Sequence, residues 1–177
     1  MEPAPEPNVD VKSLAAGEPA AYAALYARLA RRLLRVAAAM LGDAAEAEDA
    51  VHDLFVALAR GRERLTYVED LDAYVFASLR HAIAARTDRR RFERRHLERL
   101  TSIPVSAGQS ADATDKGEVS AALAALPPEQ REIVVMKIDG GLTFAQIAQA
   151  LSISPNTAAS RYRYAMEKLR KLLEDRT

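Results

Sequence analysis

The chain has 177 residues, of which 49% are apolar and 28% charged, and its 25 Lys and Arg balance its 25 Asp and Glu. This composition is typical of a soluble globular protein with one ordinary domain or two small ones. The absence of cysteine excludes disulfides, Cys-ligated zinc and thiol catalysis and fits a cytoplasmic location, and no apolar run reaches the ~18 residues that span a bilayer.

The first predicted segment, residues 1–18, begins MEPAPEPNVD and is expected to be a disordered tail because it is acidic and rich in proline. It has neither a basic start nor an apolar core, so it is not a secretory signal. A helix over residues 19–41 follows and is ended by Gly42. Its apolar residues recur at helical spacing: Tyr22, Leu25, Leu29, Val36 and Met40.

The second helix is predicted over residues 44–60, because Asp43 can cap it and Glu46 follows three residues later. A short loop separates it from a third helix that starts near Asp70. Beyond Ile83 the apolar stripe of this helix thins, so we expect its end to project from the core. The projecting window, residues 86–99, carries seven Arg against three acidic residues, which suits either phosphate binding or a solvated, ion-paired face.

Residues 101–118 are rich in Ser, Ala, Gly and Asp and have no apolar period, so they are predicted to be a flexible linker. Helices resume near Val119, and no β-alternation persists anywhere in the sequence. The fold class is therefore all-α, with two small helical domains over residues 19–100 and 119–177.

The C-terminal domain contains a helix-turn-helix pattern, GGLTFAQIAQALSISPNTAASRYRY. Thr143 can cap the first helix and Ser154 the second, and Pro155 suits the first helical position. A tight turn between two short helices presents the start of the second to a DNA major groove, although an ordinary αα-hairpin shows a similar pattern. The residues expected at this tip are Asn156, Thr157, Ser160, Arg161 and Arg163.

The stretches LPPEQREIVVMKIDGGLTFAQIAQALSISPNTAASRYRYAMEKLRKLL and LYARLARRLLRVAAAMLGDAAEAEDAVHDLFVAL resemble the C- and N-terminal domains of extracytoplasmic-function (ECF) sigma factors of bacterial RNA polymerase. The resemblance implies a promoter-specificity subunit. Its N-terminal domain would hold the clamp of the largest polymerase subunit and engage the −10 element. Its C-terminal domain would sit on the flap of the other large subunit and read the −35 element, and an anti-sigma factor is a further expected partner.

The resemblance also assigns residues. Those expected to bind polymerase are Glu48, Asp49, His52 and Asp53. Those expected at the −10 region are Arg62, Arg64, Tyr67, Arg80, His81, Arg86, Arg89 and Arg90. The sequence departs from the family pattern where Ala159 replaces a Lys, Tyr164 replaces an Arg and His52 replaces a Gln.

Two other functions fit the sequence: a stand-alone helix-turn-helix regulator, and a degenerate sigma-like protein that acts only through protein contacts. An enzyme is not expected, because His52, His81 and His96 lack metal-ligand spacing and no phosphate-loop or nucleophile motif is present. No metal or cofactor is expected.

Overall fold

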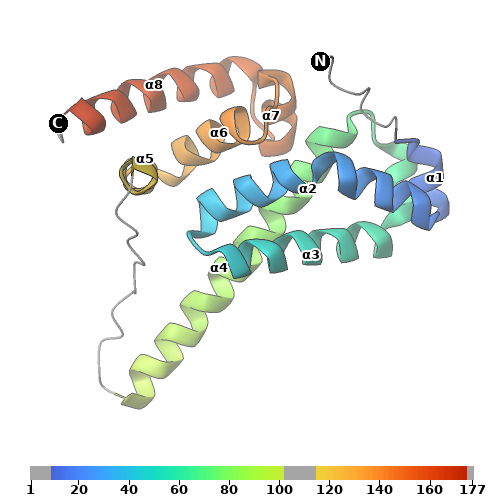
Figure 1. The fold of residues 1–177 in the computed structure, drawn as a ribbon, viewed down its shortest axis with the longest axis horizontal. Helices are drawn as coiled ribbons and strands as arrows, with labels where there is room; N and C mark the ends of the chain where they lie inside the picture. The colour runs from blue at the N-terminus through green and yellow to red at the C-terminus, as the bar shows by residue number, and fades with distance from the viewer. Residues whose placement is uncertain (1–8, 102–114, 175–177) are drawn as a thin grey trace.

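The computed structural model describes residues 9–101 and 115–174, and every regular element within these ranges is helical (Figure 1). The N-terminal domain contains α1 (Val11–Ala16), α2 (Pro19–Leu41), α3 (Ala44–Arg60), the 3-10 helix η1 (Arg62–Tyr67) and α4 (Leu71–Thr101). The C-terminal domain contains α5 (Asp115–Ala124), α6 (Pro128–Ile138), α7 (Phe144–Leu151) and α8 (Pro155–Glu174). The predicted all-α class with a C-terminal helix-turn-helix is confirmed.

Helices α2 and α3 begin and end where the sequence predicts. Gly42 adopts a left-handed conformation (φ 71°) that only glycine adopts freely, and it ends α2. The Asp43 carboxylate then accepts the backbone N–H of Glu46 at 2.9 Å and starts α3. The connection is therefore tight, and the two helices pack side by side around a fully buried apolar face.

Helix α4 starts in the core and ends outside it. The Asp70 carboxylate accepts the N–H of Ala73 at 2.9 Å and caps the helix. Val75 and Leu79 are buried, whereas residues 91–97 are all exposed. Figure 1 shows the end of α4 extending away from the other helices, as the thinning apolar stripe predicts.

Helix α6 is buried on two sides. Its run Ile133, Val134, Val135 and Met136 is buried throughout, which is typical of a helix enclosed by neighbours rather than one with a solvent face. Val134 belongs to a small core with α5 and α8, and the other three belong to a larger core that includes α2, α3 and α4. One hydrophobic core therefore extends across both domains.

Helix α5 is tied to α6 by the Arg131 guanidinium. Arg131 donates to the carbonyl oxygens of Leu123 (2.9 Å), Ala124 (2.5 Å) and Leu126 (3.3 Å), which lie in and after the last turn of α5. Burial lowers the pKa of Arg131 from its ordinary value. The contacts hold the first helix of the C-terminal domain in place.

Two predictions about segment boundaries are wrong. Residues 9–17 of the predicted disordered tail are ordered, because Leu14 of α1 is completely buried in the core; residues 1–8 lie outside the described part of the chain. Residues 115–118 of the predicted linker belong to α5, which extends from the buried Ala122, whereas residues 102–114 are not described. The short loop after α3 contains η1.

Candidate nucleic-acid and polymerase interfaces

The helix-turn-helix is shaped by capped helix starts. Thr143 and Gln146 form a reciprocal capping box at α7, with the two hydrogen bonds at 3.0 and 3.1 Å. Ser154 caps α8 by accepting the N–H of Thr157 at 3.0 Å. Between the helices, Ser152 adopts a left-handed conformation (φ 55°). These bonds fix the short break between α7 and α8 that the sequence predicts.

The tip of α8 is open to solvent. Asn156 and Arg163 are exposed, and Thr157, Ser160 and Arg161 are half-buried. Arg161 pairs with the exposed carboxylate of Glu129 on α6 at 3.0 Å, which draws its guanidinium toward the neighbouring helix. The five predicted tip residues therefore lie together at the surface.

Four of the eight residues predicted for the −10 region line one hollow between α3 and α4. This α3–α4 hollow has a volume of about 570 Å³ and its wall includes Arg64, His81, Arg86 and Arg89. Arg62 and Tyr67 lie on η1, which follows α3 directly, and Tyr67 is 87% exposed. Arg80 and Arg90 do not line this hollow; Arg80 pairs with Glu132 and Arg90 with Glu46.

The basic and acidic residues predicted for different partners pair with one another. Arg86 of α4 contacts the carboxylates of Asp53 (2.7 Å), Asp49 (3.3 Å) and Glu46 (3.3 Å) on α3, and Arg90 contacts Glu46 at 2.9 Å. Burial lowers the pKa of the Arg86 guanidinium, but the hydrogen bonds and charges of these carboxylates together raise it by more. The net effect is a pKa above the ordinary value. Arg86 is therefore permanently charged and joins α3 to α4.

The residues predicted to bind polymerase fall into two groups. Asp49 and Asp53 face Arg86, whereas Glu48 and His52 line an apolar hollow of about 720 Å³ between α2 and α3. The ring of Tyr26, which is 51% exposed, lies 5.2 Å from the ring of Phe55 in this α2–α3 hollow. Sequence reasoning missed Tyr26, although its spacing of four residues from Tyr22 places both aromatics on one face of α2.

The C-terminal domain carries a third hollow. It lies between α5, α6 and α8, has a volume of about 750 Å³, and its lining includes the exposed side chains of Val119, Ile138 and Met166. Exposed apolar surface of this kind is typical of protein–protein contacts. We refer to it as the α5–α8 hollow.

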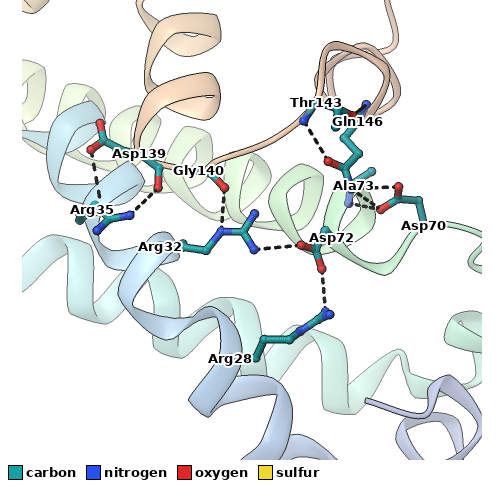
Figure 2. Close-up of polar contacts among 10 residues, drawn as sticks. All are labelled: Arg28, Arg32, Arg35, Asp70, Asp72, Ala73, Asp139, Gly140, Thr143 and Gln146. Atoms are coloured by element: carbon teal, nitrogen blue, oxygen red, sulfur yellow. Dashed lines mark hydrogen bonds and ion pairs between the residues drawn. The ribbon is translucent and has the colours of Figure 1, made fainter. Parts of the chain in front are cut away.

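Polar contacts join the two domains (Figure 2). The Arg32 guanidinium on α2 donates from Nε to the carbonyl oxygen of Gly140 at 2.7 Å, and it also contacts Asp72 at 3.0 Å. Arg28 contacts the same carboxylate at 2.6 Å. A Cβ at Gly140 would collide with the carbonyl oxygen of Met136, so only glycine lets the chain turn here and direct its carbonyl toward Arg32.

Further contacts flank this centre. Gln146 of the α7 capping box donates from Nε2 to the carboxylate of Asp70 at 3.1 Å, so one side chain links the helix-turn-helix to the start of α4. Arg80 of α4 pairs with Glu132 of α6 at 2.7 Å. Burial raises the pKa of Glu132, although Arg80 partly opposes the rise. The helix-turn-helix is thus held against the N-terminal domain.

Two protein-family models match the chain in succession. The model described as Sigma-70 region 2 matches residues 25–93, and the model described as Sigma-70, region 4 matches residues 116–169. The ECF RNA polymerase sigma factor SigL of Mycobacterium tuberculosis is 33% identical over 175 residues, which cover 93% of this chain and 96% of SigL. The chain belongs to the ECF sigma factors. This sigma factor is also similar to the RNA polymerase sigma factor CarQ of Myxococcus xanthus, with 31% identity over 159 residues that cover 86% of this chain and 89% of CarQ.

Two solved structures share the fold of this sigma factor. CnrH in complex with the cytosolic domain of CnrY is 22% identical, with a TM-score of 0.69 and coverage of 94% of this chain and 96% of CnrH. The sigma factor RpoE from Bartonella quintana, in complex with the anti-sigma factor NepR, is 24% identical, with a TM-score of 0.63 and coverage of 85% and 96%.

As a sigma factor, the chain directs RNA polymerase to promoters, and its family is one of initiation factors rather than enzymes. None of the relatives named above supports a stand-alone regulator or a degenerate protein. Within residues 9–101 and 115–174, no group of acidic and histidine side chains is placed to hold a metal ion. Over the same residues, no helix is both long and apolar enough to cross a membrane.

Proposed function

We propose that this sigma factor divides promoter recognition between its two domains. The tip of α8 reads the −35 element in the duplex, while η1 and the α3–α4 hollow engage the −10 strand after it separates. The observation that carries the proposal is the open tip of α8, where Asn156 and Arg163 are exposed at the start of a capped helix. This activity belongs in the cytoplasm, where polymerase and promoters meet.

The −10 assignment is supported by chemistry that suits an unpaired base. A base that leaves the duplex needs an aromatic surface and cations, and stacking on an aromatic side chain recovers ~1–3 kcal/mol per base. Tyr67 is the most exposed aromatic of the described residues, and the α3–α4 hollow beside η1 carries Arg64, His81 and Arg89. Arg62 lies on η1 as well, whereas Arg80, Arg86 and Arg90 pair with carboxylates in this arrangement.

Two apolar hollows suit the protein partners. The α2–α3 hollow combines Tyr26 and Phe55 with the polar edge of Glu48 and His52, a mixture that fits an amphipathic, basic helix of the polymerase clamp. Asp49 and Asp53 extend this acidic edge along α3, although they also pair with Arg86. The more apolar α5–α8 hollow fits the flap of the other large subunit.

The two domains must separate before one molecule can read a whole promoter. The −10 and −35 elements are 25 base pairs apart by definition, which is about 85 Å at 3.4 Å per base pair. In the packed arrangement, Gln146 of the helix-turn-helix touches Asp70, only three residues from Tyr67. The packed arrangement is therefore a closed state, and its resemblance to sigma factors solved with an anti-sigma factor supports such a partner for this chain.

The test is run-off transcription with purified core polymerase on a library of promoter fragments. We expect transcripts from a subset of fragments that share two short elements, and we expect Asn156→Ala with Arg163→Ala to abolish preference at the upstream element alone. Core binding should stay unchanged, because neither Asn156 nor Arg163 lines the α2–α3 hollow or the α5–α8 hollow. Transcription that is independent of any shared sequence would refute the proposal.

A further inference from the structure

The segment before α2 packs chiefly against η1. Helix α1 lies beside the turn between α3 and α4 (Figure 1), and Leu14 of α1 is buried in the same core as Leu65 of η1. Both side chains are at most 1% exposed, and Val9 is buried with them. A helix of six residues has little stability of its own, so this packing is what keeps α1 in place.

The ends of α1 fit this position closely. The Asp10 carboxylate caps the helix by accepting the N–H of Lys12 at 3.1 Å. Gly17 ends it in a left-handed conformation (φ 81°), and a Cβ there would lie 3.1 Å from Cδ of Arg62. The stem of Arg62 therefore rests over the glycine, and a larger residue at this position would displace it.

The last turn of α3, which leads into η1, is tied to the start of α2 in the same region. Tyr22, which follows α1 at the start of α2, donates its hydroxyl to the carbonyl oxygen of Leu58 at 3.4 Å, in the last turn before η1. A 3-10 helix of six residues is longer than most and has poorly aligned hydrogen bonds, so its shape depends on its surroundings. In η1 the one buried anchor is Leu65.

We propose that α1 is a positioning element for promoter reading. Because α1 packs against η1, it stabilises the 3-10 conformation of η1. This conformation positions Tyr67 and Arg64 for the separated −10 strand and so determines which bases are preferred there. The side chain of Tyr67 is 87% exposed and Tyr67 is the last residue of η1, so the shape of η1 determines where the ring stands. This inference rests on the proposed function of the N-terminal domain.

The test compares Leu14→Ala with two control variants in the full chain. Lys12→Ala changes the exposed face of the same helix. Leu126→Ala removes an equal volume from the small core of the C-terminal domain, away from η1 and outside the lining of the α5–α8 hollow. Hydrogen exchange of the η1 amides is measured without polymerase or DNA. Base preference is measured by transcription from promoters with randomised −10 bases, and strand separation by 2-aminopurine fluorescence at the −10 element.

We expect Leu14→Ala to speed amide exchange in η1 at least tenfold, to lower the preference at the −10 bases about fivefold or more, and to slow strand separation. Affinity for core polymerase and for −35 duplex should change less than twofold, and both controls should leave the −10 preference as in the wild type. Gly17→Val, which keeps Leu14 but displaces Arg62, should shift the same readouts.

The outcomes separate the two proposals. Wild-type activity with an unchanged −10 preference in Leu14→Ala, or unchanged amide exchange in η1, would overturn the role of α1 alone. The same loss of −10 preference in Leu126→Ala would also overturn it, since the effect would then reflect general destabilisation. A wild-type chain that opens no promoter with core polymerase would refute the proposed function and the role of α1 together.

Discussion

Replacing Arg32 by alanine should shift this sigma factor from the closed toward the open arrangement. The substitution removes the hydrogen bond between Arg32 Nε and the carbonyl oxygen of Gly140, which crosses the domain boundary at 2.7 Å. Gly140 is buried, so in the closed state its carbonyl loses a charged donor and has little access to water. Asp72 keeps a partner, because Arg28 still contacts it at 2.6 Å.

The magnitude follows from that one bond. A hydrogen bond from a charged donor contributes about 1.5–3 kcal/mol, and only 23% of the Arg32 side chain is exposed, so screening by solvent removes little of this. Since about 1.4 kcal/mol corresponds to a factor of ten, the ratio of open to closed molecules should rise roughly 10- to 100-fold.

Single-molecule energy transfer measures this ratio directly. The chain has no cysteine, so Ala45→Cys on α3 and Lys168→Cys on α8, both exposed, give two unique labelling sites on different domains. Arg31→Ala is the matched control, because it removes the same charge from an exposed position one residue away. If the fraction of open molecules were the same in Arg32→Ala and Arg31→Ala, the reasoning that this hydrogen bond holds the domains together would be refuted.

Three further results are expected. Arg161→Ala should lower −35 occupancy about tenfold without altering core binding, whereas Glu129→Ala, which releases Arg161, should not lower it; a gel-shift titration separates the two. Tyr26→Ala with His52→Ala should weaken binding to core polymerase by tenfold or more in a pull-down titration, and unchanged affinity would exclude the α2–α3 hollow. Because burial raises the pKa of Glu132, the closed state binds a proton more readily than the open one. The closed fraction should therefore grow as pH falls from about 7 toward 5, and Glu132→Gln should flatten that dependence in the same energy-transfer assay.

The sequence predicts what is local in this fold. The caps at Asp43 and Ser154, the stop at Gly42 and the exposed tip of α8 all depend on residues within one turn of each other, so the pattern and the structure agree. The prediction for the stretch before α2 is wrong, because residues 9–17 are too few to show a helical period, and the burial of Leu14 depends on η1, some fifty positions later.

The candidate sites show the same limit. The sequence places Asp53 and Arg86 on separate surfaces, yet the fold brings these residues, 33 positions apart, to within 2.7 Å. Arg28 and Arg32 are typical of a solvated helix face when only α2 is considered, but both pair with Asp72 of α4, and Arg32 also bonds to Gly140 of the C-terminal domain. The assignments of individual residues to DNA and to polymerase remain predictions.

Helix α6 ties the separation of the two domains to the exposure of buried apolar side chains. Met136 on α6 and Phe76 on α4 line the seam between the domains, and both are buried while the seam is shut. Separating the domains would expose part of these apolar side chains to water, which costs up to about 1.5–3 kcal/mol for each side chain. Opening of the closed state is therefore most favourable where the surface of another protein covers the newly exposed apolar side chains. Domain separation and binding of that partner would then occur as one coupled step.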